Sequence, residues 1–234
     1  MTVSVARSAR YLPQRARIIG LREVGGDVRE IVLRPLSGET FPSFEAGAHI
    51  DVCLRGDAVR QYSLLNDPDE RNRCVIAVKK SPNRFDEPAP DEERLIVGQP
   101  VEIGIPRNHF SLDRGSRDVL LVAGGIGLTP MFAMGHALVR ENSTFAFHIC
   151  ARSREALPYA DELDRLPFGS RIRVHLDDGP AAQQLDDDDL GLWSSGRSLY
   201  LCGPIGFVSA VIERARRLSW PDRAIHTESF SPSK

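Results

Sequence analysis

The sequence lacks the patterns that mark metalloproteins. Its 234 residues include four cysteines that stand far apart, with none of the paired spacings of a zinc or iron–sulfur site: Cys53, Cys74, Cys150 and Cys202. The six histidines are scattered without metal-ligand spacing. The acidic run from Asp186 to Asp189 has no framing turn and is typical of a solvated loop. We therefore expect no metal site, and we expect buried, reduced thiols of a cytoplasmic protein.

Strong net charge and long apolar runs are also missing. The formal net charge is -2, with 41% hydrophobic and 26% charged residues, and no apolar run approaches the length of a membrane span. Neither a nucleic acid nor a membrane is expected as a partner. Five arginines and no acid precede Glu23, a composition that resembles a transit peptide. Because Ile18-Ile19-Gly20-Leu21 already reads as a strand, we interpret residues 1–11 as a short basic arm.

Glycine is concentrated in one stretch that follows a buried strand. Val119 to Val122 are apolar, and the turn Gly124-Gly125-Ile126-Gly127 comes directly before Thr129 and Pro130, which are predicted as the N-cap and first residue of a helix. A strand, a glycine turn and a helix N-terminus together form an anion site. A plain strand-to-helix connection would need only one glycine. The stretch therefore predicts binding of a nucleotide pyrophosphate.

The end of the next predicted strand bears on which nucleotide is bound, NADH or NADPH. No acidic residue ends it where ribose is usually held, and Arg152, Ser153 and Arg154 stand there instead. The two arginines could bind the 2′-phosphate of NADPH, so NADH and NADPH both remain candidates.

The order of predicted elements divides the chain in two. Six short β-prone runs lie between Arg17 and Ile105 without a long helix, which predicts an antiparallel Greek-key barrel. After Ser116 strands and helices alternate, which predicts a parallel sheet covered by helices. Helices are expected at Pro130 to Arg140, Tyr159 to Leu166 and Pro204 to Leu218. We expect a barrel domain at 12–114 and an α/β domain at 115–234.

The barrel half carries a signal of its own in Arg60-Gln61-Tyr62-Ser63. Along a strand, Arg60 and Tyr62 point to one face, so a guanidinium and an aromatic ring are presented together. Such a pair suits a flat or anionic ligand, because the ring stacks and the guanidinium donates in a fixed fork. A packing tyrosine beside a surface arginine is the alternative interpretation.

Four motifs follow one another along the chain: Arg60-x-Tyr62-Ser63-Leu64, Gly124-Gly125-Ile126-Gly127-Leu128-Thr129-Pro130-Met131, Tyr200-x-Cys202-Gly203-Pro204 and Glu228-Ser229-Phe230. In this order and at these separations they resemble the ferredoxin–NADP reductase superfamily. Within it the chain is most similar to the reductase components of Rieske oxygenases, the phthalate dioxygenase reductase and vanillate demethylase reductase group. The resemblance covers roughly Leu12 to Phe230.

The resemblance implies a flavin-binding barrel, with FMN or else FAD, packed against an NAD(P)H domain. Hydride would pass from the nicotinamide to the flavin, and electrons would leave to a separate ferredoxin or Rieske-type oxygenase. The implied flavin contacts are Arg60, Tyr62, Ser63, the backbone of Ala77, Val78 and Lys79, and Phe230. The implied nucleotide contacts are Gly124, Gly125, Ile126, Gly127, Thr129, Pro130, Arg152, Ser153, Arg154, Asp178, Cys202, Gly203 and Pro204. The implied catalytic residues are Ser63, Cys202 and Phe230.

Two departures from that group leave a second function open. Between Ser81 and Arg94 the chain has five carboxylates and no glycine, where the group has a glycine-rich helix start that binds the flavin phosphate. A flavin-free descendant that binds a nucleotide or a partner protein is the alternative. The chain also stops at Lys234, where the group usually continues into a plant-type ferredoxin domain, so either the chain was shortened or its iron–sulfur partner is a separate protein.

Overall fold

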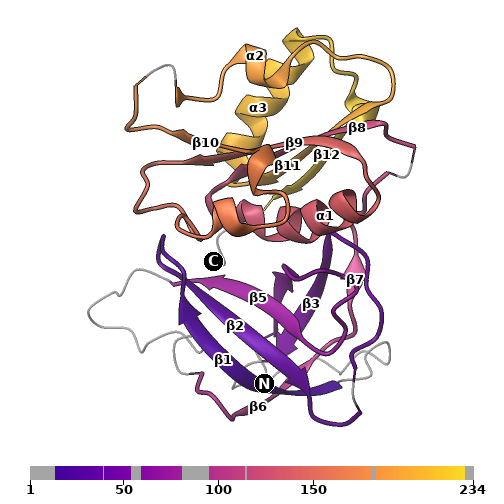
Figure 1. The fold of residues 1–234 in the computed structure, drawn as a ribbon, viewed down its shortest axis with the longest axis vertical. Helices are drawn as coiled ribbons and strands as arrows, with labels where there is room; N and C mark the ends of the chain where they lie inside the picture. Colours follow the sequence, from indigo (N-terminus) through magenta and orange to yellow (C-terminus); the bar gives the residue numbers. More distant parts are fainter. Residues whose placement is uncertain are drawn as a thin grey trace, which may run out of the picture.

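The computed structural model contains two sheets, one above the other (Figure 1). It describes residues 14–38, 40–53, 59–80, 95–113, 115–180 and 183–229. The first sheet has seven antiparallel strands and the second has five parallel strands. The predicted fold class, an antiparallel barrel followed by a parallel α/β domain, is confirmed.

Along the strands of the antiparallel sheet, residues alternate in direction, so one face of the sheet packs inward. Its order is β4-β3-β6-β1-β2-β5, and β7 pairs with β3 outside that path. Ile18, Ile31 and Ile50 belong to a closed apolar core, and each is at most 1% exposed. The strands are β1 (Gln14–Glu23), β2 (Val28–Pro35), β3 (Ala48–Cys53), β4 (Val59–Ser63), β5 (Cys74–Lys79), β6 (Pro100–Ile103) and β7 (Arg107–Asn108).

The barrel is open between its two end strands. β4 pairs with β3 and β5 with β2, and within the described ranges no ladder joins β4 to β5. Just past the end of β4, the Leu65 amide donates to the Val75 carbonyl near the start of β5 at 2.9 Å, so the end of β4 and the start of β5 lie close together. We call the gap between β4 and β5 the seam. It leaves one backbone edge of each strand outside the sheet ladder.

The parallel sheet has the order β10-β9-β8-β11-β12 and helices on both faces. Residues of β8 alternate between two cores: Leu121 packs with α1, whereas Leu120 and Val122 pack with α3. The strands are β8 (Asp118–Gly124), β9 (Thr144–Ala151), β10 (Ile172–Leu176), β11 (Arg197–Gly203) and β12 (Ile225–Ser229). The helices are α1 (Leu128–Arg140), α2 (Asp187–Leu190) and α3 (Ile205–Arg217), with 3₁₀ turns η3 (Gly125–Gly127), η4 (Leu163–Arg165), η5 (Gly169–Arg171) and η7 (Asp222–Ala224).

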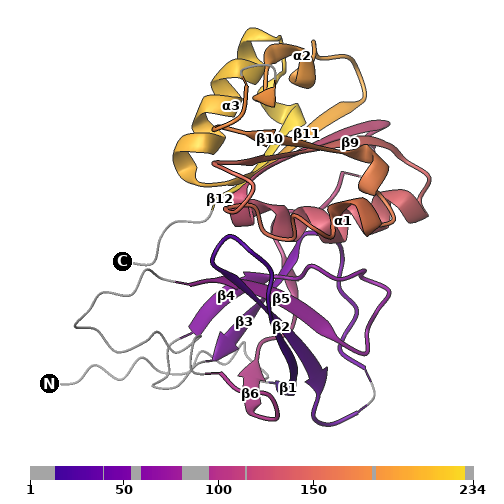
Figure 2. The same cartoon turned by 60° about the vertical axis from the view of Figure 1, so that its left-hand side comes forward.

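The two sheets share one apolar core through α1, which lies between them (Figure 2). Val28 and Leu65 of the barrel belong to the same buried cluster as Met131 of α1. Backbone bonds cross the junction as well: the Gly26 amide donates to the Glu155 carbonyl at 3.0 Å, and the Tyr159 amide to the Val24 carbonyl at 2.6 Å. The barrel is therefore held in one orientation against the parallel sheet.

Local structure differs from prediction at two places outside the glycine turn. The helix predicted at 159–166 is wrong, because only Leu163–Arg165 forms a 3₁₀ turn. Tyr159 has a positive φ of 61°, which a helix does not allow, and its amide is used by the barrel. The solvated loop predicted at Asp186 to Asp189 is a short capped helix, and Asp189 is half-buried with its side chain turned inward. Among the described helices, none has both the length and the hydropathy needed to cross a membrane.

Candidate active site

The seam of the barrel meets the carboxyl edge of the parallel sheet, where ligands of open α/β sheets bind. Strands β8, β11 and β12 end together at this edge, since Cys202 pairs with Ala123 on one side and with Glu228 on the other. From the barrel, Ser63 at the end of β4 reaches the same place. The site is therefore shared by both sheets.

Ser63, Cys202 and Glu228 form a buried polar cluster across this junction. The Ser63 hydroxyl donates a hydrogen bond to the Glu228 carboxyl, and Ser63 is buried. Burial raises the pKa of Glu228 to about 7, although the Ser63 hydrogen bond opposes the shift. Burial, together with the negative charge of Glu228, raises the pKa of Cys202 well above its ordinary value. Cys202 is therefore a neutral thiol beside a carboxyl that can hold a proton near neutral pH.

From the sequence, Ser63 and Cys202 are predicted as site residues, whereas Glu228 is only part of a motif and has no predicted role. Its Oε2 atom is buried and has no hydrogen-bond partner among the described residues. Only the register of β11 and β12 in the fold sets Glu228 beside Cys202. A buried carboxyl with an unsatisfied oxygen and a raised pKa is typical of a functional group.

The glycine turn after β8 is packed tightly against β11. A Cβ atom at Gly127 would overlap the Cys202 carbonyl oxygen and lie 2.8 Å from the Gly203 nitrogen. A Cβ at Gly124 would lie 2.7 Å from Phe207. In contrast, Gly125 has a φ of +56°, and no atom lies within 4 Å of a Cβ placed there. Two glycines thus allow close packing, and Gly125 borders open space.

The helix that follows begins earlier than predicted. α1 starts at Leu128 with Gly127 as its N-cap, so the prediction of Thr129 as N-cap and Pro130 as first residue is wrong by two positions. The 3₁₀ turn η3, which includes Ile126, leads directly into α1. Proline is tolerated there because the first-turn amides of a helix have no carbonyl partner. No side chain of the described residues caps these amides, and the first turn holds no acidic residue, which suits an anion.

The arginine pair lies just past β9 at the same edge. Arg154 makes an ion pair with Asp161 at 3.0 Å between two exposed side chains. Arg152 is exposed, and its carbonyl accepts from the Asp178 amide at 3.1 Å. Ser153 is half-buried and accepts a hydrogen bond from the Ala156 amide at 3.3 Å. Asp161 thus places a carboxylate beside the Arg154 guanidinium near the end of β9, although no acidic residue ends that strand in the sequence.

The barrel residues that were predicted as flavin contacts lie on the two strands that border the seam, with Tyr62 packed against the barrel core. Arg60 and Tyr62 are the partly buried residues of β4 and alternate with exposed neighbours, as predicted. Across the seam are the buried Ala77 and Val78 and the exposed Lys79, all in β5. Gly203 ends β11 and Pro204 caps α3 beside the glycine turn. Phe230 and the segment from Ser81 to Arg94 lie outside the described residues.

An antiparallel barrel joined at an open seam to the carboxyl edge of a parallel sheet defines a two-domain reductase of the ferredoxin–NADP reductase type. Known proteins agree. The chain is 37% identical over 215 residues to vanillate O-demethylase oxidoreductase of Pseudomonas sp. (strain HR199 / DSM 7063). This alignment covers 92% of this chain and 68% of the relative. It is 33% identical over 223 residues to phthalate dioxygenase reductase of Burkholderia cepacia, covering 92% of this chain and 67% of that relative.

A solved structure of phthalate dioxygenase reductase, described as modular for electron transfer from pyridine nucleotides to [2Fe-2S], superposes with a TM-score of 0.85. The match has 32% sequence identity and covers 95% of this chain and 70% of that one. No protein-family model matches the sequence. The chain spans about two thirds of the length of these relatives. It belongs to the family of oxygenase reductase components that includes both named proteins, and it is an NAD(P)H-dependent oxidoreductase.

Proposed function

We propose that the chain accepts hydride from NAD(P)H on a flavin bound in the seam and delivers electrons one at a time to a ferredoxin or Rieske-type oxygenase. One observation carries the proposal. The Ser63–Glu228 hydrogen bond joins the open edge of the barrel to the nucleotide edge of the parallel sheet, beside Cys202. Two ligands placed at these two edges would meet at the cluster.

The seam fits a flat ring with a polar edge. Backbone groups of Ala77 and Lys79 point to the same edge of β5 as those of Val75, which bond to Leu65 and Asn66, so along the seam they can bond a ligand, whereas those of Val78 point to β2. Arg60 and Tyr62 lie on β4 across the gap, where a ring can stack and a guanidinium can donate. Of the two flavins we propose FMN, since FAD needs a further site for its adenine. A Phe230 contact with the flavin remains a proposal from the resemblance alone.

The second edge fits a dinucleotide. The pyrophosphate would lie on Gly125, which borders open space, and on the uncapped first turn of α1. Thr129 and Pro130 are part of that turn. The nicotinamide would lie against Cys202, Gly203 and Pro204, while Arg152, Ser153, Arg154 and Asp178 would contact the adenosine ribose. Arg154 already pairs with Asp161, so Arg152 is the better candidate for a 2′-phosphate.

The residues of the cluster would control water and protons at the point of transfer. A bound flavin supplies the chemistry, because it accepts two electrons as hydride and releases them singly. Cys202 is fully buried and its thiol stays neutral, so it adds no charge next to the place proposed for the nicotinamide. Ser63 donates to Glu228, whose pKa of about 7 lets it hold or release a proton during turnover. We propose a barrel domain at 12–114 and an α/β domain at 115–234 as the two binding units.

The test is the visible absorption spectrum of the purified protein, before and after anaerobic addition of NADH or NADPH, with the released cofactor identified by chromatography. We expect flavin bands that bleach with a reduced nucleotide. Arg60→Ala should lose flavin while its melting temperature stays near that of the parent, since a ligand-facing arginine contributes little to the core. A colourless protein that takes up neither FMN nor FAD would refute the proposed function and favour a flavin-free binding role.

A further inference from the structure

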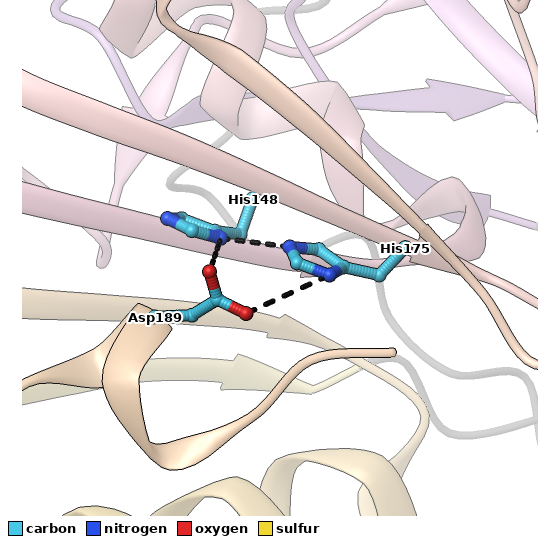
Figure 3. Close-up of side chains that lie close together, drawn as sticks. All are labelled: His148, His175 and Asp189. Atoms are coloured by element: carbon cyan, nitrogen blue, oxygen red, sulfur yellow. Dashed lines mark hydrogen bonds and ion pairs between the residues drawn. The ribbon is translucent and has the colours of Figure 1, made fainter. Parts of the chain in front are cut away.

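A second polar cluster lies on the face of the parallel sheet that carries α2 and α3. It consists of His148 from β9, His175 from β10 and Asp189 from α2 (Figure 3). His148 Nδ1 lies 2.8 Å from His175 Nε2. The Asp189 carboxylate oxygens lie 3.8 Å from His148 Nδ1 and 3.7 Å from His175 Nδ1. Each residue offers one ligand atom, and these atoms lie within 4.8 Å of one another.

All three side chains are shielded from water. His148 is 6% exposed and His175 is 4% exposed, and the Asp189 side chain is 6% exposed. Buried imidazoles and carboxylates are retained where they are hydrogen-bonded, paired or bound to a metal. A shielded set of two nitrogen donors and a carboxylate contributed by three separate elements therefore calls for a physical reason.

The hydrogen bonds around His175 leave a lone pair directed into the cluster. Its Nδ1 lies 3.2 Å from the Gln183 carbonyl oxygen, which can only accept, so Nδ1 carries the proton and Nε2 carries the lone pair. Metal-binding histidines are oriented by this kind of bond from the second ring nitrogen to a backbone carbonyl. Without a cation, His148 Nδ1–H donates to His175 Nε2.

The charge of the cluster suits a cation. Burial lowers the pKa of His148 to about 4 and also lowers the pKa of His175, so both rings are neutral at neutral pH. Burial opposes ionisation of Asp189, but the Asp186 amide and Arg173 hold the Asp189 pKa below its ordinary value. Two neutral imidazoles and one carboxylate carry a net charge of about -1. Arg173 is the opposing cation, and its side chain is 68% exposed, so it can move into water at little cost.

We propose that His148, His175 and Asp189 bind one divalent transition-metal ion, zinc being the ion that this donor set suits best. Imidazole and carboxylate are ordinary zinc ligands, and zinc–nitrogen bonds of about 2.0–2.1 Å in a tetrahedral site put two nitrogens about 3.4 Å apart. The 2.8 Å contact between the histidines has to widen by about 0.6 Å to reach that separation. The ion takes the place of the proton between His148 Nδ1 and His175 Nε2 and of the Arg173 guanidinium at Asp189. It then links α2 to strands β9 and β10.

The experiment uses the full chain, treated with a chelator and titrated with zinc chloride alone in a calorimeter. We expect one ion bound per chain with micromolar or tighter affinity. His148→Gln, His175→Gln and Asp189→Asn should each weaken binding at least tenfold, as loss of a ligand does. The matched controls His136→Gln and Asp188→Asn should bind as the parent does. Zinc should raise the melting temperature of the parent and the controls by several degrees, and that of the three variants far less.

Cobalt(II) titration of the parent gives a second readout that does not depend on how well the variants fold. A visible absorption band that saturates at one equivalent and is displaced by zinc supports the site. No zinc binding, binding that all three variants retain, or binding lost in Cys150→Ser but kept in the histidine variants would overturn the proposal. Neither titration uses nucleotide or flavin, so this site can fail while the proposed function stands, and the reverse also holds.

Discussion

Replacement of Glu228 by glutamine tests whether the active-site carboxyl is buried with a raised pKa. Burial moves this pKa from an ordinary 4.5 to about 7. The folded state then holds its proton over a pH range in which the unfolded chain has released it. The stabilisation is fully present below pH 4.5 and is lost as the pH rises through 7.

The expected magnitude follows from the size of the shift. One pKa unit corresponds to about 1.4 kcal/mol, so the parent should lose about 2 to 3 kcal/mol of stability relative to Glu228→Gln between about pH 5 and pH 8. Glutamine keeps the size and the polar head of the side chain without an ionisable group. The variant should therefore be more stable than the parent at alkaline pH, and the difference should shrink in acid.

Urea-induced unfolding of both proteins at several pH values measures this difference. Other titrating groups cancel in the comparison, because parent and variant share them. The matched control is Glu141→Gln, an exposed carboxylate at the end of α1, whose stability difference from the parent should not change with pH. A Glu228→Gln difference that is equally independent of pH would refute the reasoning, since the buried proton would then not exist.

Three further predictions concern the same site. Ser63→Ala should slow anaerobic flavin reduction by NAD(P)H about tenfold in stopped-flow measurements, the loss expected of one charge-assisted hydrogen bond, and an unchanged rate would exclude Ser63 from the transfer step. Gly127→Ala should cost about 3 kcal/mol or more in urea unfolding because its Cβ overlaps the Cys202 carbonyl, whereas Gly125→Ala should cost about 1 kcal/mol and mainly raise the KM for nucleotide. Equal stability of these two variants would contradict the packing argument. If a 2′-phosphate is bound, Arg152→Gln should lower kcat/KM for NADPH relative to NADH more than Arg154→Gln does, because Arg154 is held by Asp161; an unaltered ratio in both variants would remove the arginines from that role.

Local signals were sufficient wherever neighbouring residues decide the conformation. The apolar run before Gly124 forms β8, and the glycines after it form a tight turn into α1, because strand burial and backbone freedom depend on residue type. The start of α1 was predicted two residues late, since the 3₁₀ turn η3 depends on packing against β11. Such packing cannot be read from the adjacent sequence.

Where distant segments compete, local signals were wrong. Residues 159–166 have the apolar content of a helix, but the Tyr159 amide bonds to Val24 of the barrel, and the backbone there takes a positive φ. Asp189 belongs to an acidic run that is typical of a solvated loop. In the fold it turns inward to two histidines whose own strands are separated by η4 and η5. Tertiary contacts override propensity in both cases.

The sequence by itself determined the two-part architecture, the glycine turn and the face of β4 that carries Arg60 and Tyr62, because periodicity and residue type act over a few neighbours. Only the tertiary structure decided which polar groups meet. Ser63 and Glu228 lie at opposite ends of the chain, and His148 and Asp189 stand on separate elements. Their pKa values and their candidate chemistry come from shared burial, and burial is a property of the packed sheets rather than of any one segment.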